Sequence, residues 1–233
     1  GMPEELIAQE YLCDFTAANV GSYYGAAMAQ MERRGGLAAF ESGKDNIHTS
    51  WDLGKSDDTA IWWWRPTPNG VDVLDHYATH GEEVAHYVGV LAERAREHGW
   101  RYRKHWLPHD ARAKTLATRQ SVVEQLADAL GPQMVAITPN LALRDGISAS
   151  RKVLLGSSRI HPRCELVAHN KDCDGIEALR AYHREWDDAD KCFRETPVHD
   201  WAEAVIDRMA VTPGGDIVLL GASGAVRRVP RAA

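Results

Sequence analysis

The chain has 233 residues, 44% of them hydrophobic and 26% charged, enough for one large globular domain or a domain with a small appendage. Its formal net charge of −6 argues against a protein that coats nucleic acid nonspecifically, because neutralising phosphates needs clustered Lys and Arg. No apolar run approaches the roughly 20 residues of a membrane span, and the N-terminus has no signal-like apolar core, so we expect a cytoplasmic protein.

The first 45 residues differ in pattern from the strand and helix signals that follow them. Apolar residues recur at helical spacing from Pro3 to about Met31, and the polar segment MERRGGLAAFESGKDN, with its Gly35-Gly36 pair, is typical of a linker. We therefore predict that residues 1–45 form an N-terminal arm or linker.

Strand and helix signals then alternate along the chain. Three strand-like runs, IHTSWDLG, TAIWWWRP and VDVLDHYA, are separated by turns at 54–58 and 66–70. A helix over 81–99 ends at Gly99, a fourth strand covers 103–110, a second helix covers 121–130, and MVAIT forms a fifth strand. Beyond it we expect an irregular region, a helix GIEALRAYHREW, and a last helix that begins near Asp200.

This order predicts an α/β fold with a mixed five-stranded sheet, three antiparallel strands followed by two parallel ones, flanked by helices. It is the architecture of the ribonuclease H-like nucleases and integrases. The first and fourth strands are neighbours in such a sheet, so Asp52, at the end of the first, and Asp110, just past the fourth, can meet. Asp200 would join them from the late helix.

Carboxylates gathered from distant parts of a sequence repel one another, so a fold keeps them together around a hard cation such as Mg²⁺ or Mn²⁺. Each acid alone has a simpler interpretation: Asp52 is a turn former, Asp110 a helix N-cap, and Asp200 an N-cap with Glu203 completing a capping box. On the late helix, Asp200, Glu203 and Asp207 share one face, and we rank them in that order as the third ligand.

Two basic stretches qualify the negative net charge. One brackets Asp110 and the other runs from Arg144 to Arg163; either could track a phosphate backbone or be a solvated surface of mixed charge. Lys55 and Lys114 lie close to the acids in sequence and are the candidate phosphate contacts.

Four segments together resemble the C-terminal nuclease domain of the large terminase subunit of tailed bacteriophages and prophages. They are WDLGKSDDTAIWWW, LPHDARAKTLATRQSVVEQL, GIEALRAYHREWDD and PVHDWAEA, and the resemblance covers about residues 47–211. The N-terminal QEYLCDFTAA resembles the end of the terminase ATPase region. The resemblance implies a nuclease domain over 46–212, and it implies that residues 1–45 are the tail of an ATPase region whose body is absent from this chain. The pattern of residues 213–233 predicts a C-terminal hairpin or tail.

The resemblance also implies a function. We expect an endonuclease that cuts double-stranded DNA concatemers during genome packaging in the bacterial host, with two Mg²⁺ or Mn²⁺ ions held by Asp52, Asp110 and Asp200. Its partners would be the terminase ATPase region, the small terminase subunit and the portal. No GxxxxGK[ST] motif occurs, so we expect the motor to lie outside this chain.

The sequence departs from the family after HDW, where AEAVIDRMA replaces the usual continuation. This leaves the third ligand open between Asp200, Glu203 and Asp207. Two alternatives follow: a noncatalytic assembly module of the packaging motor, and a nuclease of the same fold that acts on DNA junctions or RNA:DNA hybrids.

Overall fold

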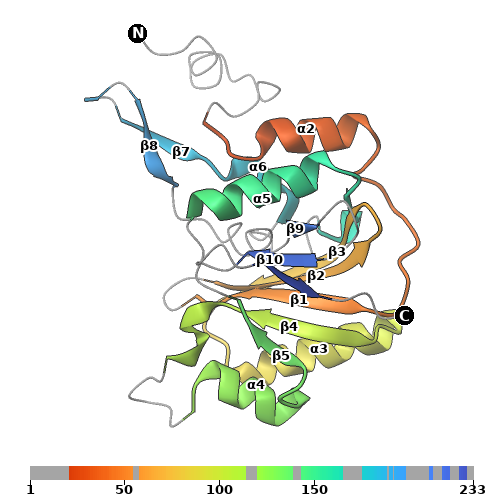
Figure 1. Cartoon of the computed structure of the whole chain (residues 1–233). Helices are drawn as coiled ribbons and strands as arrows, with labels where there is room; N and C mark the ends of the chain where they lie inside the picture. The colour runs from red at the N-terminus through yellow and green to blue at the C-terminus, as the bar shows by residue number, and fades with distance from the viewer. Residues whose placement is uncertain are drawn as a thin grey trace.

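A six-stranded sheet forms the centre of the protein (Figure 1). The computed structural model describes residues 21–54, 58–113, 120–138, 143–164, 175–187, 189–190, 192–197, 210–211, 217–220 and 226–229. The strand order is β5-β4-β1-β2-β3-β6. The strands are β1 (Ile47–Asp52), β2 (Thr59–Thr67), β3 (Gly70–Thr79), β4 (Tyr102–Leu107), β5 (Val135–Ile137) and β6 (Arg159–Ile160).

The directions of the strands confirm the predicted ribonuclease H-like sheet. β1, β2 and β3 are antiparallel neighbours, whereas β4 is parallel to β1 and β5 is parallel to β4. The prediction contained five strands; the sixth, β6, is a short edge strand parallel to β3. β1 therefore lies between an antiparallel and a parallel neighbour, in the middle of the sheet.

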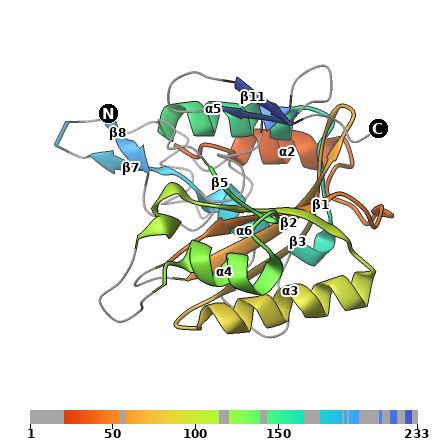
Figure 2. The same cartoon turned by 60° about the horizontal axis from the view of Figure 1, so that its bottom comes forward.

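Helices cover both faces of the sheet (Figures 1 and 2). α3 (Val84–His98) and α4 (Val122–Leu130) pack on one face through Tyr87, Leu91 and Leu126. α2 (Gly25–Arg33), α5 (Leu143–Leu155) and α6 (Gly175–Ala181) pack on the other. Since side chains alternate along a strand, Trp62 and Trp64 lie in the core beneath α2, α5 and α6, and Trp63 lies in the core beneath α3 and α4.

The helix boundaries follow local signals. α4 begins with a capping box, in which the backbone N–H of Glu124 donates to the Ser121 hydroxyl and the Glu124 carboxylate accepts from the backbone N–H of Ser121. α3 ends at Gly99, whose φ of 67° is the left-handed conformation that favours glycine. The chain then enters β4 directly, which fixes where the fourth strand begins.

Residues just after position 20 belong to the packed body of the protein. Tyr24, Met28 and Met31 are fully buried against α5 and α6. The Arg34 guanidinium donates to the carbonyl oxygens of Leu154 at 3.0 Å and Ser158 at 2.7 Å, which satisfies the C-terminal end of α5. The domain boundaries near residues 45 and 212 remain predictions.

Two segments differ from the local predictions. The region expected to be irregular contains α5, and the helix expected over GIEALRAYHREW ends at Ala181. It ends there because the carbonyl of Tyr182 accepts from the backbone N–H of Tyr23, and the Tyr182 ring stacks on Tyr24 at 5.5 Å. The chain continues as β7 (Arg184–Asp187), which pairs with β8 (Cys192–Pro197).

The remaining elements are short. They are the 3-10 helices η1 (His109–Arg112) and η2 (Pro162–Cys164), and a three-stranded sheet of β9 (Ala210–Val211), β10 (Ile217–Leu220) and β11 (Val226–Val229). The predicted helix near Asp200 lies outside the described residues. None of the helices in the described ranges combines the length and apolar character needed to cross a bilayer.

Candidate functional site

Asp52 and Asp110 lie at the same edge of the central sheet. Asp52 is the last residue of β1, and Asp110 lies in η1, three residues beyond the end of β4. β1 and β4 are parallel neighbours in which Ser50 is opposite Trp106, so both acids follow the carboxyl ends of adjacent strands. The strand order thus brings together two acids that are 58 positions apart in the sequence.

The two acids differ in exposure. Asp52 is half-buried, next to Ala60 of β2, while Asp110 is exposed. The turn at Asp110 is closed by its own backbone, since its carbonyl accepts from the N–H of Ala113 at 2.8 Å. No hydrogen bond or ion pair in the described part of the chain engages the Asp110 carboxylate, so it is available to a ligand.

The register that sets the positions of these acids is fixed by buried polar contacts on both faces of β1. On the α3 side, Thr49 Oγ1 accepts from Trp51 Nε1 at 2.8 Å and also lies 2.8 Å from His105 Nδ1 on β4. Burial lowers the pKa of His105 to about 4. A neutral imidazole can therefore join the hydroxyl without carrying a charge into the core.

On the α5 side, His48 joins three strands. Its Nδ1 accepts from Trp106 Nε1 of β4 at 3.0 Å, and its ring stacks on Trp64 of β2 with the centroids 4.6 Å apart. Burial, with a smaller effect of Arg103, lowers the pKa of His48 to about 3. Because Nδ1 is an acceptor, Nε2 carries the ring proton and donates to Asn46 Oδ1 at 3.3 Å.

A chain of polar contacts lies at the same edge of the sheet, where β3 ends and α3 begins. Tyr77 Oη is 2.7 Å from His86 Nε2, and His86 Nδ1 is 3.7 Å from Glu82 Oε2. Sequence reasoning missed this chain. Glu82 precedes α3, which begins at Val84, so helical spacing does not pair it with His86 and no sequence pattern marks the contact.

The other predicted site residues lie outside the described residues. They are Lys55, Lys114, Asp200, Glu203 and Asp207. Within the described ranges, no group of three or more His, Cys, Asp or Glu side chains is placed to hold a metal ion. The two described carboxylates fit a hard divalent cation in ligand type, because Mg²⁺ and Mn²⁺ prefer oxygen ligands.

Comparison with solved structures shows similarity to the large terminase from a thermophilic bacteriophage. The complex of that protein with ADP matches with a TM-score of 0.52 and 14% identity over 76% of this chain and 42% of that chain. Its complex with ATP-gamma-S matches with a TM-score of 0.50 and 14% identity over 74% and 41%. The P22 large terminase nuclease domain matches with a TM-score of 0.46 and 17% identity over 70% and 80%.

The two matches to the thermophilic phage protein establish the fold of this chain. The chain spans about two fifths of the length of that large terminase. No protein-family model matches the sequence, and a search of curated proteins finds no match.

Proposed function

We propose that this chain is a metal-dependent endonuclease that cuts double-stranded DNA, and that it is the nuclease part of a large terminase subunit. The observation that carries the proposal is the placement of Asp52 and Asp110 after the carboxyl ends of adjacent parallel strands. The fold shared with part of the large terminase of a thermophilic phage supports it. An ATPase region, a small terminase subunit and a portal would be its partners.

In this proposal Asp52, Asp110 and one late acid, with Asp200 ranked before Glu203 and Asp207, would hold two Mg²⁺ or Mn²⁺ ions. The bound ions would supply Lewis acidity and an activated water for phosphodiester hydrolysis. Half-buried Asp52 would be the shared ligand and exposed Asp110 would face the solvent side, where DNA arrives.

Two lysines would act on the DNA. Lys55 and Lys114 follow Asp52 and Asp110 by three and four positions, so each would contact a phosphate near its acid. No side chain has to act as a nucleophile, because water attacks the phosphorus. The buried contacts of His48 and Thr49 would keep the two acids in register.

The test is nicking of supercoiled plasmid in Mn²⁺, comparing the wild type with Asp52→Asn and Asp110→Asn. Asp45→Asn is a matched control, because Asp45 precedes the other end of the same strand and forms an exposed ion pair with Arg101 that contributes little to stability. We expect both edge variants to lose at least about 100-fold in rate, as for removal of a single transition-state contact, and the control to keep wild-type activity.

Cleavage that persists in EDTA, or equal rates in the wild type and Asp52→Asn, would refute the proposal. A folded wild-type chain that cuts no DNA in Mn²⁺ would instead favour the noncatalytic assembly module. Competition between plain duplex and four-way junction DNA would distinguish the two kinds of nuclease.

A further inference from the structure

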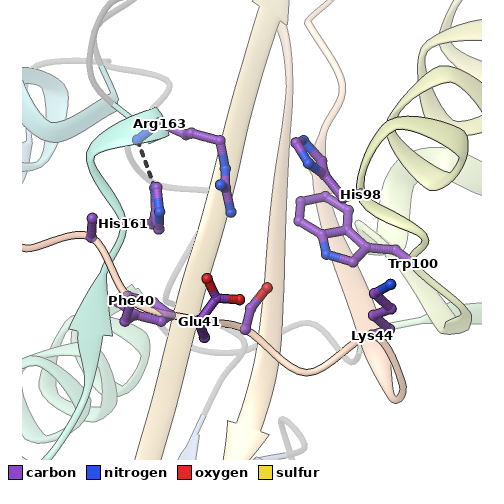
Figure 3. A pocket seen from close by; sticks show the side chains of 9 residues that line it. Phe40, Glu41, Lys44, His98, Trp100, His161 and Arg163 are labelled. Atoms are coloured by element: carbon purple, nitrogen blue, oxygen red, sulfur yellow. Dashed lines mark hydrogen bonds between the residues drawn. The ribbon is translucent and has the colours of Figure 1, made fainter.

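A cavity of about 400 Å³ is lined by nine residues (Figure 3). It lies where β1 and β4 begin, at the end of these strands opposite the acids. It is bounded by the segment 39–44, the end of α3 and η2. Lys44 lies three residues before β1 and Trp100 two residues before β4, whereas Asp52 ends β1. At about 3.3 Å per residue, the length of β1 separates the cavity from Asp52 by roughly 16 Å.

The aromatic rings around the cavity already have stacking partners. The His98 ring lies 4.5 Å from Trp100, and the Arg163 guanidinium lies 5.9 Å from the centroid of the same indole. Phe40 has the Arg159 guanidinium at 4.0 Å and the His161 ring edge-on at 5.4 Å. A ligand in this cavity would therefore meet polar groups rather than an open aromatic face.

Two cations that line the cavity, Lys44 and Arg163, form no ion pair within the described residues. Asp75, whose pKa is raised by burial and lowered in part by nearby charges that include Arg163, already pairs with Arg94 at 2.8 Å, and Asp45 pairs with Arg101. The cavity lining thus carries two cations against one carboxylate, Glu41, a local excess of positive charge in a chain whose net charge is negative.

Both cations are held in place by their surroundings. Arg163 Nε donates to the carbonyl oxygen of Leu74 at 3.3 Å, which leaves its terminal nitrogens available. The stem of Lys44 lies along Gly99, where an added Cβ would approach Lys44 Cδ to 3.2 Å. Less side-chain entropy is then lost when either cation binds a ligand.

The histidines of the cavity add a hydrogen-bond donor without a charge. Burial, followed by the Arg163 charge, lowers the pKa of both His98 and His161. His161 Nδ1 accepts from the backbone N–H of Arg163 at 3.1 Å, so the ring proton of neutral His161 lies on Nε2.

One carboxylate, Glu41, lies in the gap between the His161–Arg163 side and the Trp100–Lys44 side of the cavity (Figure 3). A carboxylate among donors repels an anion that has no proton, but it accepts a hydrogen bond from an anion that keeps one. Inorganic phosphate keeps such a proton near pH 7, whereas sulfate and the diester phosphates of DNA do not.

We propose that this cavity is a binding site for inorganic phosphate, held by Lys44, Arg163 and His161 and selected by Glu41. The site is distinct from the proposed nuclease edge and does not rest on the proposed function. Binding is measured in EDTA, where a metal-dependent nuclease is inactive.

The test is titration calorimetry with inorganic phosphate at pH 7 and constant ionic strength, with sulfate as the competing anion. Charge-assisted hydrogen bonds contribute about 1.5–3 kcal/mol, so we expect Arg163→Gln and Lys44→Gln each to weaken phosphate binding by at least about tenfold. Arg33→Gln is the matched control, since it removes an exposed cation on α2 and should bind phosphate like the wild type.

Glu41→Gln tests the selectivity. The wild type should bind phosphate at least about tenfold more tightly than sulfate, and Glu41→Gln should bring the two affinities together, because an amide can donate to either anion. Phosphate binding should also raise the pKa of His98 and His161 in proton NMR titrations, because an anion stabilises their charged forms.

Three outcomes would overturn the inference. They are the absence of phosphate binding to the wild type, equal binding in the wild type and in both cation variants, and competition by a duplex oligonucleotide without terminal phosphates. The last would assign the cavity to the DNA backbone. Lys44 is exposed, so Lys44→Gln keeps the test decisive if Arg163→Gln disturbs folding.

Discussion

Acid should unfold this protein well above the pH at which ordinary carboxylates protonate. Three histidines, His48, His76 and His105, lie in the core with at most 1% of their surface exposed. Burial lowers the pKa of His48 and His76 to about 3 and that of His105 to about 4, from an ordinary 6.5. Between pH 6.5 and about 4, the unfolded chain therefore binds three protons that the folded chain does not.

This difference in bound protons decides whether the free energy of unfolding rises or falls with pH. A histidine with a lowered folded pKa gives stability that is fully present above pH 6.5 and is lost as the pH falls. Asp75 opposes this, because burial outweighs the ion pair with Arg94 and raises its pKa to about 6. Asp75 thus gives stability at low pH, which is lost as the pH rises from 3.8 to 6.

The magnitude follows at about 1.36 kcal/mol per proton and pH unit. Between pH 6.5 and 5, proton binding by the three histidines in the unfolded chain lowers the free energy of unfolding by about 6 kcal/mol. Between pH 6 and 5, Asp75 raises it by about 1.4 kcal/mol. The net loss of about 5 kcal/mol is comparable with the whole stability of a typical domain, about 5–15 kcal/mol. We therefore expect cooperative unfolding near pH 5.

The assay is urea denaturation followed by tryptophan fluorescence at pH 7.5, 6.5, 5.5 and 5.0. His76→Gln should reduce the pH slope of the free energy of unfolding by about one third, or about 1.4 kcal/mol per pH unit. His80→Gln is the control, because this side chain is exposed. A urea midpoint that stays the same between pH 7.5 and 5.5 would refute the reasoning.

Three further predictions concern stability. Asp72→Asn should lower the free energy of unfolding in urea by about 2 kcal/mol, because the Asp72 side chain is 1% exposed and pairs with Arg159 at 2.8 Å. Arg159 reaches solvent, so the loss stays below the roughly 3–5 kcal/mol of a fully buried pair. Met28→Ala should cost about 2–5 kcal/mol and lower the Tm, whereas exposed Gln30→Ala should change stability by less than about 0.5 kcal/mol; equal effects would contradict the packing of α2. Arg34→Met should cost about 1–2 kcal/mol and speed hydrogen exchange in the last turn of α5; unchanged exchange there would refute the capping role.

The central sheet could be predicted because its signals are local. β1, β2 and β3 alternate between two buried faces and are separated by turn residues, and Gly99 marks where α3 ends. The parallel arrangement of β4 and β5 then follows from the helices that connect them. Local pattern and chain order were enough for the strands that position Asp52 and Asp110.

α5 could not be predicted in the same way. Its sequence contains Gly146 and two serines, which are weak helix formers, and Ser150 Oγ donates back to the carbonyl of Gly146 at 2.9 Å. The helix is stabilised instead by packing of Val153 and Leu154 in the core and by the Arg34 contacts at its end. These partners come from α2 and the residue that follows it, more than 100 positions earlier, so no local pattern shows them.

Only part of the candidate site could be predicted from the sequence. Strand order alone predicted that Asp52 and Asp110 share an edge. The chain of Tyr77 and His86 and the buried pair of His48 and Trp106 depend on side-chain geometry, and the sequence has no pattern that marks them. The third metal ligand remains a prediction, and the proposal places it among Asp200, Glu203 and Asp207.

The buried histidines connect the acid sensitivity of the fold to the proposed chemistry. Thr49 with His105, and His48 with Trp106, join β1 to β4, and this pairing holds Asp52 and Asp110 at one edge. Protonation of His48 removes the acceptor of the Trp106 hydrogen bond, and protonation of His48 or His105 places a charge in the buried region where β1 and β4 pair. Ordinary carboxylates protonate near pH 4, below the pH at which the histidines favour unfolding. Nuclease activity and native fluorescence should then be lost together near pH 5, whereas activity lost while the fold stays intact would show that the acids, and not the core, set the limit.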